Sequence, residues 1–303
     1  MTGHGVLRGS RFELDYHNDE RYPENLREIP HPPEKLYVIG SLDALAPGLA
    51  VIGAREATPY GLGCARRFAR IAAEKGVCII SGGARGCDAE AHRAALDAGA
   101  PTVVFLGGGC DRLYPARHFD LFQQVIDSGG AVVSEHPWDF DPLPYTFRAR
   151  NRLIAGLAEA VLIVEAGLPS GTFSTADEAL AIGKEILVVP GAITSQTSRG
   201  SNRLLYQGAI PIVDDESFED VLFSVLGMLK RPVGNSAVDA FEDPVIAAVR
   251  ASAQDLESLL RLAVECYGGD AAREKLMQTL VEGEARGVIA RLPDGSWGPV
   301  VKA

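Results

Sequence analysis

Seven short apolar runs, separated by stretches long enough for a helix, constrain the fold of this chain more than any other feature. They read LAVIGA, GVCIIS, TVVFLG, AVVSE, AVLIVEA, EILVVPG and IPIVDD, and all lie between residues 49 and 215. Their Val and Ile residues alternate little with polar ones, which is typical of parallel strands covered on both faces. We therefore predict an α/β fold with a doubly wound, mostly parallel, Rossmann-like sheet.

The segments around these runs predict the helices and the domain limits. We expect helices from Tyr60 to Lys75 and from Asp88 to Asp97, since a glycine soon follows each and can end it. Residues 1–47 read as an N-terminal lead-in, 48–229 as the Rossmann-like domain and 230–244 as a linker without periodicity. Residues 245–303 combine a helical pattern with two short strands around an Asp294-Gly295 turn, which predicts a small winged-helix-like domain.

Composition and charge narrow the class of protein. No apolar run approaches the ~20 residues of a membrane span and the N-terminus lacks a signal-peptide pattern, so we expect a cytoplasmic protein without a membrane partner. The five cysteines form no CxxC pair, which argues against a metal site and a disulfide framework. The net charge is -11, but residues 48–214 carry 15 basic and 17 acidic side chains and leave room for a local basic patch. Any polyanion bound there should bind weakly and in a salt-sensitive way.

Glycine-rich turns follow several predicted strands and indicate a binding site. Gly82, Gly83 and Gly86 in SGGARG leave amides open at the start of the next helix, where a phosphate can bind. In a parallel sheet this turn shares one edge with those at VIGAR, LGGGCDRLYP, SEHP, EAGLPSG and VPGAI, so all six should meet at one crevice. The arginines on or near that edge are Arg55, Arg85, Arg148, Arg150 and Arg152. Together these features predict a phosphate site; the alternative is that the glycines serve only tight turns and helix packing.

Taken in order, several long motifs resemble the DNA-processing protein A family, also called DprA or Smf. They are VIGAREATPYG, IISGGARGCDAEAHRAAL, GGGCDRLYP, VVSEHP, FRARNRLIAGLAEAVLIVEA, SGTFSTADEAL and VVPGAITSQTSRGSNRLLYQGA, within a match from about Tyr22 to Asp214. The resemblance implies an extended Rossmann fold that binds single-stranded DNA, forms a homodimer and helps load the RecA recombinase. It also implies protection of incoming DNA in natural transformation, with no catalysis and no cofactor.

The family's DNA-binding positions can be carried over one by one. The residues expected to contact DNA or phosphate are Gly53, Arg55, Ser81, Gly82, Gly83, Arg85, Gly86, Arg148, Arg150, Asn151, Arg152, Ser170, Gly171 and Thr172. Ala54 departs from the family pattern, because it replaces the usual serine and removes one hydroxyl hydrogen bond while keeping the amide. The alternatives are ion pairs at a helix start for the arginines of RNR, and simple helix capping for Ser170.

The family resemblance and the sheet edge also predict an assembly. Leu204, Leu205 and Ile210 should be exposed on the last helix and edge strand of the sheet, where they would need cover. We expect them to form the homodimer interface. Residues 215–303 carry 9 basic and 15 acidic side chains, so we expect the C-terminal domain to contact protein, or the rest of the chain, rather than DNA.

Two other functions are open to a crevice of this kind. Nucleotide phosphoribohydrolases of the LOG-like group carry a catalytic glutamate in P-G-G-x-G-T-x-x-E, but Thr175 stands at that place and Glu178 lies three residues later. A nucleotide-sensing module would instead bind a mononucleotide tightly and DNA poorly. Asp88 and His92 share one helix face, but we interpret Asp88 as a helix cap and His92 as a structural hydrogen-bonding residue rather than as a catalytic pair.

Overall fold

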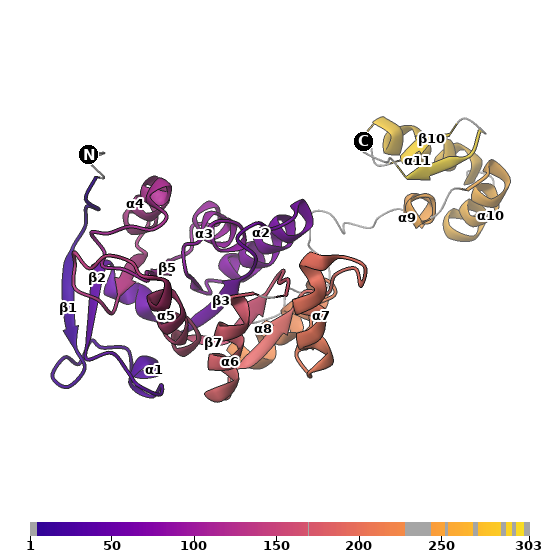
Figure 1. Cartoon of the computed structure of the whole chain (residues 1–303). Helices are drawn as coiled ribbons and strands as arrows, with labels where there is room; N and C mark the ends of the chain where they lie inside the picture. Colours follow the sequence, from indigo (N-terminus) through magenta and orange to yellow (C-terminus); the bar gives the residue numbers. More distant parts are fainter. Residues whose placement is uncertain are drawn as a thin grey trace. The chain divides into compact units, whose positions relative to one another are not determined.

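The chain folds into two compact units, Met1–Lys230 and Arg231–Ala303. The computed structural model describes residues 5–168, 170–227, 244–251, 254–268, 272–285, 289–292 and 295–299 (Figure 1). No helix in these ranges is long and apolar enough to cross a membrane.

A nine-stranded sheet forms the centre of the first unit, in the order β1-β2-β6-β5-β4-β3-β7-β8-β9. Its strands are β1 (Arg11–Asp15), β2 (Lys35–Gly40), β3 (Gly48–Ile52), β4 (Ile79–Ser81), β5 (Thr102–Phe105), β6 (Ala131–Ser134), β7 (Ala158–Ile163), β8 (Glu185–Val188) and β9 (Ile210–Pro211). Strands β3 to β9 run parallel and correspond to the seven apolar runs, so the predicted doubly wound sheet is confirmed. The lead-in adds two antiparallel strands that the sequence analysis did not predict, with β2 paired to β6 and β1 paired to β2.

Helices cover both faces of this sheet. They are α1 (Glu24–Arg27), α2 (Pro59–Glu74), α3 (Cys87–Asp97), α4 (Phe119–Asp127), α5 (Pro144–Leu157), α6 (Thr172–Ala181), α7 (Arg199–Tyr206) and α8 (Asp215–Leu226), with short 3-10 helices at Leu42–Leu45, Ala116–His118 and Gln196–Ser198. On β3, Ala50 and Ile52 pack under α5 and α6 on one face, whereas Leu49 and Val51 pack under α2 and α3 on the other. Apolar residues are therefore needed at every position of the strand, which explains the lack of polar alternation.

The two helices predicted from sequence are confirmed to within one residue at each end. The hydroxyl of Thr58 caps α2 by accepting a hydrogen bond from the amide of Gly61 at 3.2 Å, and Pro59 occupies the first turn. The chain leaves α2 through Gly76, whose φ of +80° suits glycine.

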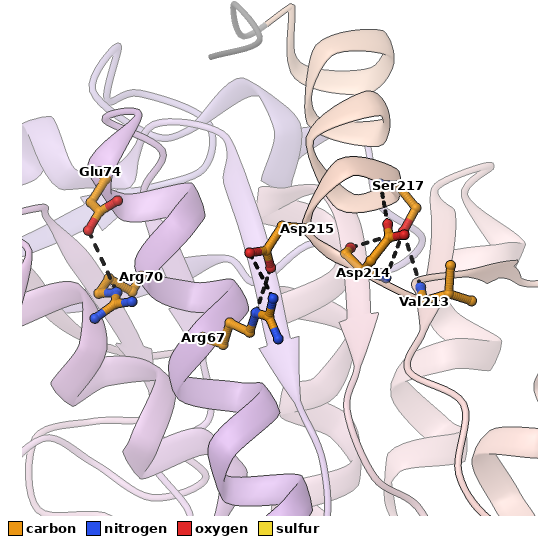
Figure 2. A network of polar contacts seen from close by, with 7 residues as sticks. All are labelled: Arg67, Arg70, Glu74, Val213, Asp214, Asp215 and Ser217. Atoms are coloured by element: carbon orange, nitrogen blue, oxygen red, sulfur yellow. Dashed lines mark hydrogen bonds and ion pairs between the residues drawn. The ribbon is translucent and has the colours of Figure 1, made fainter. Parts of the chain in front are cut away.

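Helix α8 closes the first unit by packing on α2. The rings of Phe68 and Phe218 lie 4.9 Å apart in the core between the two helices. At the surface, Arg67 forms an ion pair with Asp215 at 2.6 Å, and Asp214 caps α8 by accepting a hydrogen bond from the amide of Ser217 (Figure 2). Residues far apart in sequence thereby fix the end of the sheet domain.

The second unit has its own small core. It contains α9 (Pro244–Ala251), α10 (Leu256–Tyr267) and α11 (Ala272–Ala285), followed by β10 (Ile289–Arg291) and β11 (Trp297–Pro299), which pair antiparallel. Val245, Leu259, Leu276 and Trp297 are among its buried residues. Helices followed by a hairpin match the predicted order, and the winged-helix interpretation stays a prediction. The predicted linker up to residue 243 and Asp294 of the predicted turn lie outside the described residues.

Candidate functional site

A cleft opens at the point of the sheet where the strand order reverses. Strand β3 pairs with β4 on one side and with β7 on the other, so the segments that leave β3 and β7 turn to opposite faces. Such a switch point leaves a crevice beyond the carboxyl ends of the strands. The cleft there measures about 710 Å³ and is lined by the turns after β3, β4 and β7 and by one side of α5.

Most of the predicted DNA-binding residues meet in this cleft. Those that line it are Gly53, Arg55, Arg85, Arg148, Arg150, Asn151, Ser170, Gly171 and Thr172. Ser81, Gly82, Gly83, Gly86 and Arg152 do not line it. Gly82 instead lines a small pocket beside the cleft, together with Arg55, Arg85 and Arg150.

The turn SGGARG is closed by a carboxylate of the protein itself. Asp88 is 6% exposed, and its Oδ2 accepts hydrogen bonds from the amides of Gly82 at 3.2 Å and Ala84 at 3.3 Å. Burial raises the pKa of Asp88, while the charge of Arg150 and these amides oppose the shift. Two amides that the sequence analysis offered to an external phosphate are thus already occupied. Asp88 also does not cap α3 as expected, because it bonds to amides that precede the helix.

The glycines of this turn serve close packing between neighbouring turns. A Cβ on Gly86 would lie 2.2 Å from the carbonyl oxygen of Ala54, and φ at Gly86 is +76°. A Cβ on Gly82 would lie 2.5 Å from the guanidinium of Arg150. The packing alternative raised by the sequence therefore accounts for these two glycines.

Arg150 lies beneath the cleft rather than on its rim. Its side chain donates to the carbonyl oxygen of Gly82 at 2.9 Å and to that of Phe105, and the residue is 5% exposed. Burial lowers the pKa of Arg150 to about 10, and the nearby charge of Asp88 opposes this shift. The residue ties α5 to the ends of β4 and β5, and its Nε has no hydrogen-bond partner among the described residues.

The other members of the RNR motif also make internal contacts. Arg152 forms a two-pronged ion pair with Glu135, at 2.8 and 2.6 Å, and its Nε donates to the carbonyl of His31 at 3.1 Å. Arg152 is thus ion-paired, but in the second half of α5 and not at a helix start, where the sequence analysis placed its alternative. Asn151 lines the cleft and donates to the hydroxyl of Ser174 at 2.6 Å, which joins α5 to α6.

The start of α6 is held by its own side chains. The hydroxyl of Ser170 accepts a hydrogen bond from the amide of Thr172 at 3.2 Å and donates to the hydroxyl of Thr172 at 3.0 Å. The N-cap of α6 is Gly171, and no side-chain hydrogen bond caps this helix among the described residues. Ser170 thus bonds within the turn just before the helix and is not the N-cap that its alternative interpretation expected.

Three arginines remain exposed along the cleft. Arg55 and Arg148 have no carboxylate partner within 4.0 Å in the described part of the chain, and Arg85 reaches Glu56 only at 3.5 Å. Exposed pairs of this kind contribute little to stability, so all three guanidiniums stay available to an anion.

Two aromatic rings stand beside these arginines, and the sequence analysis assigned neither to the site. The rings of Tyr114 and Phe147 lie 5.2 Å apart, and the guanidinium of Arg55 lies 5.8 Å from the centre of Phe147. Tyr114 is 52% exposed. The signal in the sequence was an aromatic residue directly beside a basic or glycine-rich motif, as in RLYP and FRAR.

A buried carboxylate that the sequence analysis missed fixes the two sides of the switch point. Glu165, in the segment after β7, accepts hydrogen bonds from the amide of Thr58 at 2.8 Å and from its hydroxyl at 3.0 Å. Its backbone carbonyl accepts from the amide of Ala54 at 2.7 Å. The turns after β3 and β7 are thereby held in one arrangement.

His92 has the structural role expected of it. It is fully buried, and its Nδ1 lies 2.7 Å from the hydroxyl of Thr102, which itself donates to the carbonyl of Ile79. Nδ1 must therefore carry the proton. Burial lowers the pKa of His92 to about 3.

At the predicted dimer interface the structure corrects one expectation. Leu204 is 4% exposed and belongs to the core below α7, because the inward face of the helix falls at this position. Leu205 and Ile210 are half-buried against the two cores. Large exposed side chains near this end of the sheet are those of Ile193, Tyr206 and Val213.

Comparison with known proteins relates this chain to a protein family. Residues 13–223 match the sequence model of the family described as DNA recombination-mediator protein A. Protein Smf of Escherichia coli is 35% identical over 280 residues, which cover 92% of this chain and 75% of that protein. A putative DNA processing protein DprA of Mycobacterium tuberculosis is 44% identical over 186 residues, or 60% of this chain and 48% of that protein.

Two solved structures share the fold. DNA processing protein A of Streptococcus pneumoniae superposes with a TM-score of 0.65 at 32% identity, covering 73% of this chain and 76% of the other. DNA processing protein A of Helicobacter pylori gives the same TM-score and identity over 72% of this chain and 97% of the other, in a structure that concerns its single-stranded DNA binding mode.

Proposed function

Because this chain belongs to the DNA recombination-mediator protein A family, we propose that it mediates recombination by binding single-stranded DNA in the switch-point cleft. The observation that carries the proposal is the set of exposed cations beside two aromatic rings. Arg55, Arg85 and Arg148 suit phosphates, and Tyr114 and Phe147 offer faces on which bases stack. Every base has such a face, so binding of this kind requires no particular DNA sequence.

The distribution of charge supports a salt-sensitive site. The whole chain carries a net charge of -11, whereas the cleft presents three exposed arginines. The carboxylates in its described lining are those of Glu56 and Asp88. Asp88 and Glu165, the buried carboxylates nearby, are both held by backbone amides. Binding should therefore rest on local contacts at the cleft and weaken steeply as salt rises.

We propose no catalytic step for this cleft. Thr175 takes the place of the glutamate of the LOG-like phosphoribohydrolases and is 2% exposed, and Glu178 is absent from the lining of the cleft. A hydroxyl at that position cannot act as the carboxylate of the reaction. Binding of a mononucleotide in the same cleft is the competing outcome that the experiment must distinguish.

The partners follow from the family and are part of the proposal. We propose that the protein works as a homodimer in the cytoplasm, protects incoming strands in natural transformation and helps load RecA on them. Exposed Ile193, Tyr206 and Val213 near the edge strand β9 support self-association through this end of the sheet. The acidic second unit suits a protein contact better than DNA.

A binding titration tests the central proposal. Oligo-dT should bind more tightly than duplex DNA of the same length and than nucleoside monophosphates, with log affinity falling against log salt by roughly 0.7 per phosphate neutralised. Arg148→Ala should weaken the binding of oligo-dT by about tenfold, since a contact between charged groups contributes about 1.5 kcal/mol. Arg70→Ala is the control, because Arg70 is exposed, lines no part of the cleft and pairs only with Glu74 in the described structure (Figure 2).

Three results would contradict the proposal. Preference for a mononucleotide over oligo-dT would favour a nucleotide-sensing module, and release of free base on incubation would favour a phosphoribohydrolase. Equal binding by Arg148→Ala and the parent would remove the cleft as the DNA site.

A further inference from the structure

A second hollow adjoins the cleft and shares a wall with it. This hollow, which we call the α3 groove, measures about 430 Å³ and runs along α3 toward the 3-10 helix Ala116–His118. Arg55 and Arg85 line both the cleft and the α3 groove. The two hollows therefore adjoin at these two exposed guanidiniums.

The α3 groove adds further positive charge beyond the cleft. Arg93 and Arg117 line it, both are exposed, and Arg117 has no carboxylate within 4.0 Å among the described residues. Glu90 also lines the groove, but it is already paired with Arg66 at 2.6 Å and with Arg93 at 2.9 Å. The groove thus carries unpaired positive charge at Arg117 and no free negative charge at Glu90.

The same turn that supports the cleft also supports the α3 groove. His118, which is 7% exposed, lies with its Nδ1 3.0 Å from the carbonyl oxygen of Gly83, and a carbonyl only accepts, so Nδ1 donates. Gly86 of the same turn lines the groove. Both hollows are consequently supported by the same turn.

We propose that a single strand leaving the cleft crosses Arg55 and Arg85 and continues along the α3 groove, where Arg117 and Arg93 contact its phosphates. The inference rests on the proposed binding of single-stranded DNA and adds a direction and a length to it. A positively charged groove that follows the backbone, placed next to a stacking platform, is how sequence-independent sites hold a strand longer than the platform itself. The site should accordingly bind long strands better than strands that fill only the cleft.

Glu56 allows a second, independent test of the same path. Its side chain is 85% exposed and lines both hollows beside Arg85, at the point where the strand would cross. A carboxylate there repels each passing phosphate. Glu56→Gln should therefore strengthen the binding of long oligo-dT more than that of short oligo-dT.

The test compares oligo-dT of about 4 and about 16 nucleotides, the span typical of single-strand grooves, on the full chain by fluorescence anisotropy. Arg117→Ala should bind the short strand like the parent and the long strand about tenfold more weakly, with a salt slope shallower by about 0.7. Arg117→Lys should restore most of the increase in affinity from the short strand to the long strand. The charge returns in this variant even though the forked geometry of arginine does not. Arg70→Ala should match the parent at both lengths.

Each other outcome has a definite meaning. No loss at either length, or an equal loss at both, would overturn the α3 groove as an extension of the path while leaving the cleft in place. A parent protein that binds oligo-dT of neither length would instead refute the proposed function itself. Thermal melting of Arg117→Ala should match that of the parent, since the side chain is exposed.

Discussion

Replacing Asp88 by alanine should lower the free energy of unfolding by about 3 kcal/mol, because the carboxylate closes the turn SGGARG from inside. It accepts hydrogen bonds from two amides at 3.2 and 3.3 Å and is 6% exposed. These are long bonds, so leaving each donor unpaired should cost about 1 kcal/mol, the low end for a buried group. Losing the negative charge near the buried guanidinium of Arg150 should add about 1 kcal/mol, well below a contact ion pair.

Urea unfolding followed by circular dichroism measures this cost. Asp88→Asn keeps an acceptor oxygen and should lose about half as much as Asp88→Ala. A cycle with Arg150→Met should show coupling, since the alanine variant loses less once the guanidinium is gone. Asp177→Asn, a change to an exposed carboxylate on α6, is the control and should stay within about 0.5 kcal/mol of the parent.

The same variants decide what the turn does for DNA. If Asp88 occupies the amides, the folded Asp88→Asn protein should bind oligo-dT like the parent. If an external phosphate uses those amides instead, removing the competing negative charge should strengthen binding. A cost below about 1 kcal/mol for Asp88→Ala, or tighter DNA binding by Asp88→Asn, would refute the reasoning.

Two further properties can be checked on the same protein. Burial lowers the pKa of His92 to about 3, below its value in the unfolded chain, so the stability held by its neutral form is present above about pH 6.5 and is lost as the pH falls toward 3. The parent should therefore lose unfolding free energy between about pH 6.5 and about pH 5, and His92→Asn should make this loss smaller by up to about 2 kcal/mol. An unchanged pH dependence would mean that His92 is not buried in its neutral form. Tyr206, which is 92% exposed on α7, should lie in the proposed homodimer interface, so Tyr206→Glu should halve the mass seen by light scattering without unfolding; a monomeric parent would rule the dimer out.

The sheet was predictable because its strands are apolar on both faces. Each of the seven runs became a strand, since Val and Ile at every position are needed where helices cover both sides. Strands β1 and β2 were missed although RFELD alternates charged with apolar residues, as an edge strand does, and KLYVIG resembles the other runs. Their position before the main pattern led to the interpretation as a lead-in.

The roles of individual arginines were less predictable, because sequence gives residue type and not direction. Arg148 and Arg150 are two positions apart on α5, and such residues point to nearly opposite sides of a helix. One is therefore exposed at the cleft while the other is buried beneath it. Leu204 and Tyr206 on α7 differ in the same way, which is why the predicted exposure of Leu204 was wrong.

The contact between Asp88 and the turn SGGARG could not be predicted from the sequence for another reason. Asp88 lies six residues after Gly82, and its spacing suits a helix cap as well as a contact with the preceding turn. Glu165 and Thr58, which join the two sides of the switch point, are 107 residues apart. No local pattern links such partners, so only the closed sheet shows that they meet.

The central position of β3 has a consequence for how the chain is made. This strand is buried along its whole length, and its two edges are covered by β4, which follows soon after it, and by β7, which is synthesised much later. A nascent chain that has released β3 to β6 therefore carries an open apolar edge, the kind of surface at which unfinished proteins aggregate. The arrival of β7 covers that edge and supplies Glu165 in the same step. On the ribosome, the arrival of β7 thus covers β3 and moves the open edge of the sheet to β7, which stays open until β8 pairs with it.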